Sequence, residues 1–267
     1  MQSPAFARLA ALTVAWIYMD TAWQFLLVIP AYRETRRLPP YLRALTAALA
    51  DAEFTTALLV VDDGSPSAEQ AELRGFAAPR RAGNCQILPP LLLPRNTGKG
   101  GAILAGWRHG VAAARWLAFV DADGAVPAGE VRRVFALAHR QRAANCWFGA
   151  RDRTAGRHVQ RRWLRGLLGK IFAWLARTWL GAEVHDSQCG FKLIPAALFQ
   201  TNGVAIQETG FCFDLDLWLT ARRAGAVIVS LPVDWRDQPG GQLRVWRDGW
   251  AMLRQLRRLR KRVASGG

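Results

Sequence analysis

Short apolar runs alternate with longer segments of helical periodicity between residues 25 and 149 of the chain. The runs are partly β-branched, and turn residues follow them, as is typical of strands buried on both faces. They lie at 25–29, 58–61, 86–88, 116–120 and 146–149. The helical segments between them lie at 38–54, 67–76, 102–114 and 129–142. Such alternation predicts an α/β fold, with a mostly parallel sheet covered by helices on both faces.

The charge of the chain requires a polyanionic partner or surface. There are 36 Lys and Arg against 20 Asp and Glu, which leaves a formal net charge of +16. Nucleic acid, anionic lipid and a phosphorylated substrate all satisfy this excess. Twelve tryptophans, several of them beside arginines, favour a membrane surface of anionic lipid. A basic nucleic-acid-binding module is the weaker alternative, because the chain contains no known nucleic-acid motif.

The cysteines argue against a zinc-binding protein, and the amino-terminal segment favours a short extension over a membrane anchor or signal, which stays the alternative. The four cysteines have no metal-ligand spacing, so they are predicted to be reduced and partly buried thiols. The apolar run Leu9–Met19 is shorter than the roughly 20 residues that span a bilayer. We therefore treat residues 1–23 as a short extension and residues 24–240 as the main domain.

Two segments rich in tryptophan and arginine are expected to be amphipathic helices. The first, about 159–180, has one broad apolar face, and it fits either a buried core helix or one at a membrane interface. The flanking arginines favour the interface. The second, 245–263 within a carboxyl-terminal region of 241–267, alternates apolar with basic residues. It suits an anionic lipid surface, with a solvated basic tail as the alternative.

Acidic residues directly follow two of the predicted strands. Ligands in open α/β sheets bind outside the carboxyl ends of the strands, where Asp62, Asp63, Asp121 and Asp123 are expected. Asp121 and Asp123 are one residue apart and offer oxygen ligands to Mg²⁺ or Mn²⁺, which would bridge a diphosphate. The alternative is that they only cap a turn. Asp62 and Asp63 are placed to bind the base or ribose of a nucleotide by hydrogen bonds.

The glycine-rich run 98–101 is not a phosphate-binding P-loop. That motif needs a glycine five positions before Gly98 and a serine or threonine after Lys99. The chain has Leu93 and Gly100 at these positions.

Six motifs in order carry a resemblance to a known family. They are Val28–Glu34, Val60–Ser65, Asn96–Gly101, Asp121–Ala125, Asp186–Lys192 and Gly210–Leu217. The first four together resemble the inverting glycosyltransferase family 2. The last two resemble its dolichyl-phosphate β-glucosyltransferase branch, whose members transfer a sugar to a polyprenyl phosphate. The resemblance covers about residues 24 to 260, and it departs from the usual family asparagine at Arg33.

The resemblance implies a glycosyltransferase-A (Rossmann-like) fold and a role for each matched residue. The nucleotide-sugar site would contain Pro30, Tyr32, Glu34, Asp62, Asp63, Lys99 and Asp121. Asp121 and Asp123 would hold the metal, while Arg151 and Arg165 would bind the acceptor phosphate. Gln188 would close over the sugar, with Trp235 packed beside it. Independently of the resemblance, Asp214 or Asp216 is a candidate base, and a structural role in helix capping is an equal alternative.

The expected activity is the inverting transfer of a hexose, with glucose expected, from a UDP-sugar to dolichyl or undecaprenyl phosphate. The protein would be peripheral, at the cytoplasmic face of a membrane. The alternative within the family is a transferase that uses GDP-mannose or builds a glycan or polysaccharide. The sequence does not determine the oligomeric state.

Overall fold

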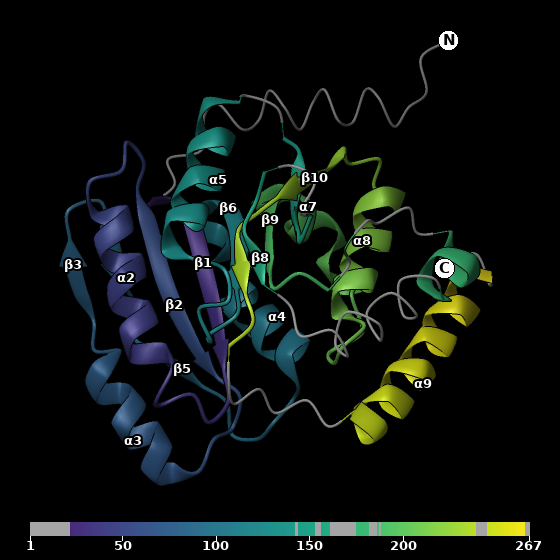
Figure 1. Cartoon of the computed structure of the whole chain (residues 1–267), viewed down its shortest axis with the longest axis horizontal. Helices are drawn as coiled ribbons and strands as arrows, with labels where there is room; N and C mark the ends of the chain where they lie inside the picture. Colours follow the sequence, from purple (N-terminus) through teal and green to yellow (C-terminus); the bar gives the residue numbers. More distant parts are fainter. Residues whose placement is uncertain are drawn as a thin grey trace.

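The computed structural model describes residues 22–141, 144–152, 156–160, 175–181, 186, 188–238 and 245–264 (Figure 1). The strands are β1 (Trp23–Ala31), β2 (Thr56–Asp62), β3 (Arg80–Ala82), β4 (Cys85–Ile87), β5 (Leu91–Leu92), β6 (Ala114–Val120), β7 (Cys146–Ala150), β8 (Val159–Gln160), β9 (Phe191–Pro195), β10 (Ile228–Pro232) and β11 (Trp235–Arg236). The helices are α2 (Leu38–Ala50), α3 (Ser67–Phe76), α4 (Lys99–Gly110), α5 (Ala128–Arg140), α7 (Ala196–Asn202), α8 (Phe213–Arg223) and α9 (Val245–Ala264), with short 3-10 turns at Val111–Ala113 and Gly203–Ala205.

One mixed sheet forms the centre of the fold. Its strand order is β10-β7-β9-β6-β1-β2-β4-β3, and β5 also pairs with β2. The pairs that involve β1 are parallel, as are those of β2 with β4 and β5. β9 is antiparallel to both of its neighbours, β6 and β7. The prediction of a mostly parallel sheet is therefore confirmed, with β9 as an antiparallel strand that the sequence did not reveal.

Helices cover both faces of the sheet, as the alternation predicted (Figure 1). The side chains of α2, α3 and α5 pack on one face, and those of α4, α7, α8 and α9 pack on the other. Successive residues of β1 point to opposite faces, so both its odd-numbered and its even-numbered side chains are buried. A strand buried on both faces needs a continuous apolar run, which explains the sequence of β1.

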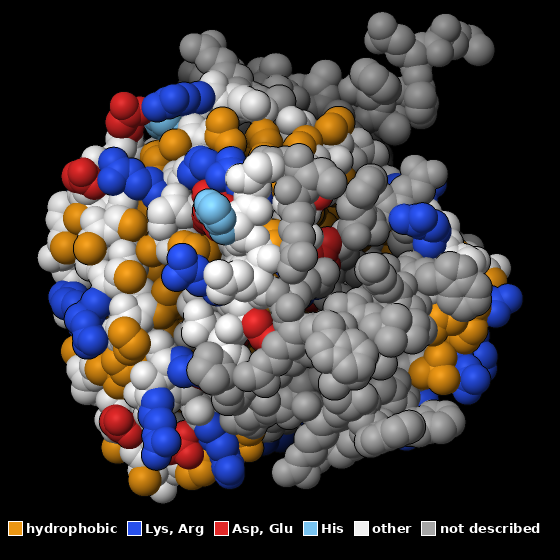
Figure 2. Space-filling view, in the orientation of Figure 1, with side chains coloured by type: hydrophobic (Ala, Val, Ile, Leu, Met, Phe, Trp, Pro, Cys, Tyr) orange, Lys and Arg blue, Asp and Glu red, His pale blue; other side chains and the backbone are white. Residues whose placement is uncertain are grey.

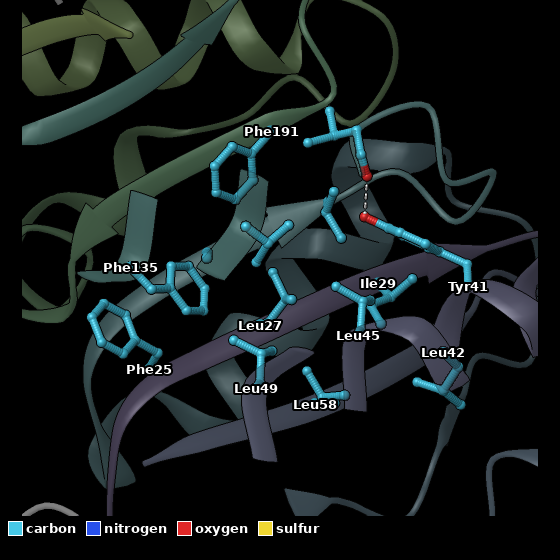
Figure 3. Close-up of a cluster of buried hydrophobic side chains, with 14 of the residues drawn as sticks. Phe25, Leu27, Ile29, Tyr41, Leu42, Leu45, Leu49, Leu58, Phe135 and Phe191 are labelled. Atoms are coloured by element: carbon cyan, nitrogen blue, oxygen red, sulfur yellow. Dashed lines mark hydrogen bonds between the residues drawn. The ribbon is translucent and has the colours of Figure 1, made fainter. Parts of the chain in front are cut away.

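The core on the α2 and α5 face is built around stacked aromatic rings (Figure 3). The rings of Phe25 and Phe135 are parallel, with centroids 4.3 Å apart. Nearby, the Tyr41 hydroxyl donates a 2.7 Å hydrogen bond to the carbonyl oxygen of Val126. This bond ties α2 to the loop between β6 and α5, which carries Asp121 and Asp123, and so fixes one border of the candidate site.

Tertiary contacts shift the ends of two predicted helices. α2 ends at Ala50 rather than at residue 54, because Phe54 leaves the helix and packs its ring 5.0 Å from that of Phe25. α4 runs from Lys99 to Gly110 rather than from 102 to 114, because Ala114 already pairs with Trp23 in the sheet.

The predicted helix of 159–180 is wrong at its start. Val159 and Gln160 form β8, which pairs in parallel with Trp235 and Arg236 of β11. The amides of Trp235 and Asp237 donate to the carbonyls of His158 and Gln160 at 2.9 and 3.0 Å. This pairing satisfies the backbone groups that a helix would have used. Residues 175–180 are helical as predicted, and 161–174 lie outside the described residues.

The carboxyl-terminal helix and the state of the thiols are confirmed. α9 spans Val245–Ala264, close to the predicted 245–263. All four cysteines are free and buried. Among the described residues, no helix combines the length and the hydropathy that crossing a bilayer requires. Residues 1–21 of the amino-terminal extension lie outside the described part of the chain.

Candidate active site

The carboxyl ends of β1, β2 and β6 meet at one edge of the sheet. Because the three strands are parallel and in register, Ala31 lies beside Asp62, and Val28 lies beside Phe119. The residues that follow each strand therefore emerge next to one another. The structure thus brings together Tyr32, the Asp62 pair and the Asp121 pair, which are far apart in the sequence.

Asp121 lies between a lysine and a loop that approaches it closely. Its Oδ1 is 2.7 Å from Nζ of Lys99, at the start of α4. Its backbone amide donates a 3.0 Å hydrogen bond to the carbonyl of Gly190. A Cβ at Gly190 would lie 2.0 Å from Oδ2 of Asp121, so a side chain at this position would force the carboxylate of Asp121 to move. The loop of residues 188–190 therefore covers one side of Asp121.

The second carboxylate, Asp123, is affected electrostatically by Asp121. Burial and then the charge of Asp121 raise the pKa of the Asp123 carboxyl above its usual value, against the opposing effects of the Ala125 amide and Arg37. The Ala125 amide donates to Oδ1 at 3.0 Å, and Arg37 lies 3.9 Å from Oδ2. The side chains of Asp121 and Asp123 remain 35% and 28% exposed, so a ligand can reach both.

This pair of carboxylates fits a divalent metal that also binds a diphosphate. Mg²⁺ and similar ions are commonly held by one or two carboxylates together with substrate phosphates. Two partly exposed acids, in which the charge of Asp121 helps to raise the pKa of Asp123, are a suitable donor set for such an ion. In the part of the chain that the structure describes, no group of three or more His, Cys, Asp or Glu residues forms a metal cage.

Asp62 and Asp63 are both buried, and they differ in their contacts. Oδ2 of Asp62 accepts hydrogen bonds from the Ser65 amide and Gln70 Nε2, both at 2.9 Å. Asp63 uses both oxygens on the glycine-rich loop: Oδ1 accepts from the Thr97 amide and hydroxyl, and Oδ2 from the Gly98 amide. Asp63 thereby fixes the loop that leads to Lys99.

The segment after β1 carries the other residues assigned to the nucleotide. Pro30 lies within β1 beside Val61, and Tyr32 is partly exposed just beyond it. Glu34 forms a two-pronged ion pair with the guanidinium of Arg37. Arg33 has a φ of +56°, a left-handed conformation that asparagine adopts more readily than arginine. This backbone angle gives a physical reason for the asparagine that the family usually has here.

Arg151 lies at the other end of the site, held by an aspartate and an aromatic ring. Nε and Nη2 of Arg151 donate to the two oxygens of Asp186 at 2.5 and 2.6 Å. The guanidinium lies over the Trp235 ring, 5.2 Å from its centroid. Gln188 donates through Nε2 to the carbonyl of Phe211 at 3.1 Å. Arg165, the second residue predicted for the acceptor phosphate, lies outside the described residues.

The two aspartates considered as bases are buried in ion pairs. Asp214 lies 3.0 Å from Nζ of Lys192, which is fully buried. Asp216 accepts from the amides of Gln207 and Glu208 at 2.8 Å, and it also lies 2.8 Å from Nη2 of Arg262. These contacts favour structural and electrostatic roles over proton transfer.

Sequence reasoning missed two cations of the site, Arg37 and Lys192. Arg37 follows Glu34 by three residues, a spacing at which helical side chains meet. Lys192 interrupts an otherwise apolar strand, where a buried lysine needs a partner. Both signals are present in the sequence, although neither indicates which carboxylate the cation meets.

The pKa of the Lys99 ammonium is raised. Burial alone would lower this pKa, but the negative charges of Asp121 and Asp214 outweigh the effect of burial.

The Arg151–Asp186 pair predicts an acid-dependent contribution to stability. Burial opposes ionisation of Asp186, but the bonds to Arg151 outweigh it and lower the pKa. A lowered pKa stabilises the fold above the unfolded value of about 3.9, and the gain is lost as the pH falls through the folded value. Asp186→Asn should cost about 1–3 kcal/mol near pH 7. Urea unfolding from pH 7 to pH 3 should show the difference from wild type shrinking below about pH 4.

The matched control is Asp51→Asn, because Asp51 pairs with Arg132 at an exposed site where its side chain is 75% exposed. Its effect should stay small at every pH. A difference for Asp186→Asn that is independent of pH would contradict the assignment.

Comparison with known proteins identifies the class of this fold and site. The family described as Glycosyl transferase family 2 matches residues 26–202. The chain therefore belongs to glycosyl transferase family 2, and it is a glycosyltransferase.

The resemblance to the dolichyl-phosphate β-glucosyltransferase branch is also confirmed. The chain is 25% identical over 250 residues to the dolichyl-phosphate β-glucosyltransferase of Dictyostelium discoideum, covering 90% of this chain and 74% of that protein. It is 27% identical over 268 residues to the human enzyme of that name, covering 95% and 80%. An undecaprenyl-phosphate mannosyltransferase of Micrococcus luteus is 28% identical over 219 residues, covering 81% and 85%.

Solved structures confirm the expected glycosyltransferase-A fold. Glucosyl-3-phosphoglycerate synthase from Mycobacterium tuberculosis, crystallised with Mn²⁺ and UDP-glucose, superposes with a TM-score of 0.62 at 17% identity. The match covers 93% of this chain and 80% of that one. TarS of S. aureus superposes with a TM-score of 0.52 at 15% identity, covering 87% of this chain and 64% of that one.

Proposed function

We propose that this glycosyltransferase moves glucose from UDP-glucose to a polyprenyl phosphate at a membrane surface, with inversion at the anomeric carbon. The observation that carries the proposal is the pair Asp121 and Asp123 at the strand edge, partly exposed and beside Lys99. This is the chemistry that a nucleotide diphosphate and its metal require. The names of the relatives that span most of the chain support the sugar and the acceptor.

Each end of the reaction has charged residues suited to it. On the donor side, a divalent ion held by Asp121 and Asp123 would neutralise the charge that builds on the departing diphosphate. Lys99, whose pKa is raised, stays protonated there and adds a positive charge. On the acceptor side, guanidinium groups suit a phosphate because they bind its oxygens in pairs, and Arg165 and Arg151 are assigned this role. Nε and Nη2 of Arg151 are bonded to Asp186, so this residue would meet the phosphate with the other side of its guanidinium.

The acceptor needs little help from a general base. A phosphate monoester has a second pKa of about 6, so it is largely ionised near neutral pH. The ion pairs of Asp214 and Asp216 agree with a reaction in which positioning matters more than proton removal. Positioning of two reactants supplies a large part of many enzymatic rate enhancements.

The surface around α9 supports attachment to an anionic membrane. Along the right-hand edge of Figure 2, where Figure 1 places α9, lysine and arginine side chains border hydrophobic ones. Arg254, Arg257, Arg260 and Lys261 are exposed on this helix. A basic amphipathic helix of this kind binds anionic headgroups. We place the protein peripherally, at the cytoplasmic face.

Radiolabelled UDP-glucose incubated with the full chain, polyprenyl phosphate and Mg²⁺ or Mn²⁺ tests the proposal. Label that enters the organic phase and releases glucose on mild acid hydrolysis is the expected result. A parallel incubation with GDP-mannose tests the second candidate, which the similarity to the mannosyltransferase favours. Absence of lipid-linked label with both donors would overturn the proposal, as would label found only in a water-soluble glycan.

Arg165→Ala should weaken use of the lipid phosphate more than binding of UDP-glucose. Losing one charged bond to phosphate should raise the acceptor KM by about 10- to 100-fold. The donor dissociation constant, measured by calorimetry, should stay near that of the wild type. Arg74→Ala is the matched control, because Arg74 is exposed on α3, away from this edge. Equal losses for acceptor and donor would count against the assigned role.

A further inference from the structure

The inner face of α9 carries three polar residues directed at one segment of the chain. Gln255 Oε1 accepts a 2.9 Å hydrogen bond from the Cys212 amide. Arg258 donates two bonds to Glu208, at 3.0 and 2.8 Å, and Arg262 lies 2.8 Å from Asp216. The spacing of three and four residues places all three on one side of the helix. The fully buried Leu256 and Leu259 lie on this side as well.

The segment that α9 holds, residues 207–213, borders two parts of the site: the glycine-rich run that begins α4 and the loop of residues 188–190. The Thr209 carbonyl accepts from the Gly101 amide at 3.2 Å, in the first turn of α4, which carries Lys99. The Phe211 carbonyl accepts from Gln188, whose loop covers Asp121. A Cβ at Gly100 would lie only 2.6 Å from Cβ of Phe213, so the segment packs tightly against the glycine-rich run.

The segment has little regular structure of its own to hold it in place. It joins the 3-10 turn Gly203–Ala205 to α8, and its first six residues form neither helix nor strand. The amides of Gln207 and Glu208 both donate to Asp216, the same carboxylate that Arg262 neutralises. The Glu208 side chain is 6% exposed, so without Arg258 its charge would be buried without its main partner.

We propose that α9 sets the geometry of the transfer site through this segment. Gln255, Arg258 and Arg262 are then positioning residues. They touch neither donor nor acceptor, but they fix the segment 207–213, against which Gln188 and the first turn of α4 pack. The inference rests on the proposed function for its kinetic readout. It gives α9 a second role, on the side of the helix that faces away from Arg257 and Arg260.

Arg258→Ala in the full chain tests the proposal. Transfer of glucose to a short, detergent-soluble polyprenyl phosphate removes any contribution of membrane binding. Because small misplacements of reacting groups cost up to 100-fold in rate, we expect kcat to fall about 10- to 100-fold. The UDP-glucose KM should change much less. Arg257→Ala, which removes an exposed arginine of the same helix, should behave as wild type.

Two rescue variants separate positioning from a general loss of packing. Arg258→Lys keeps a cation beside Glu208 and should recover part of the rate. Glu208→Gln added to Arg258→Ala removes the stranded carboxylate and should recover most of it. An Arg258→Ala enzyme as fast as Arg257→Ala would overturn the inference, and so would a loss that neither rescue variant relieves.

Amide hydrogen exchange gives a readout that does not depend on the substrate. Arg258→Ala should speed exchange in residues 98–101, because these residues pack against Thr209 and Phe213 of the segment that α9 holds. Arg257→Ala should leave these amides unchanged. Unchanged exchange in both variants would overturn the coupling. Absence of transfer by the wild type would overturn the proposed function while leaving this measurement valid.

Discussion

Replacing Asp123 by alanine should abolish sugar transfer and leave the fold intact. The substitution removes one of two carboxylates available to a metal at the strand edge, and loss of such electrostatic stabilisation costs roughly 100- to 1,000-fold in kcat. The fold should tolerate it, because the side chain is partly exposed and its ionised form is disfavoured by burial and by Asp121. Removing a charge under those conditions should change the free energy of unfolding by less than about 1 kcal/mol.

Three measurements on purified protein check this expectation: transfer to polyprenyl phosphate, Mn²⁺ binding by calorimetry, and thermal unfolding. Asp51→Ala is the control, since Asp51 is exposed at the end of α2. It should match the wild type in transfer and in Mn²⁺ binding. Transfer by Asp123→Ala within a few-fold of wild type would show that this carboxylate does not serve the reaction.

Lys192→Met should produce the largest loss of stability of the substitutions considered. Lys192 is fully buried on β9, with its ammonium 3.0 Å from Asp214 and also bonded to the carbonyl of Cys189. Removing one member of a buried ion pair strands the other charge and costs about 3–5 kcal/mol. The free energy of unfolding in urea measures this cost. Lys261→Met, at an exposed position on α9, is the matched control and should change it little.

A double variant distinguishes a stranded charge from a loss of packing. Asp214→Asn added to Lys192→Met removes the carboxylate that has lost its partner, so it should restore a substantial part of the stability. If the double variant is as unstable as Lys192→Met, packing against Phe119 and Phe148 is the larger contribution. The ammonium lies 5.9 and 5.5 Å from the centroids of these two rings.

Much of the fold was predictable because strands buried on both faces require continuous apolar runs. That requirement revealed β1, β2, β6 and β7, and it placed Asp62 and Asp121 at their carboxyl ends. β9 escaped prediction, since Lys192 interrupts its apolar pattern and its antiparallel direction leaves no local signal. Val159 was assigned to a helix instead of a strand because its pairing partner, Trp235, is distant in the sequence and leaves no local signal.

The sequence by itself determined the α/β class, the family and the acidic pairs at the strand ends, because these follow from local periodicity and from short motifs. Tertiary structure decided which charges meet. Only the folded chain places Lys99 against Asp121, Lys192 against Asp214, and Arg258 and Arg262 against Glu208 and Asp216. Ion pairs of this kind depend on distances between remote residues, and no local pattern specifies those distances.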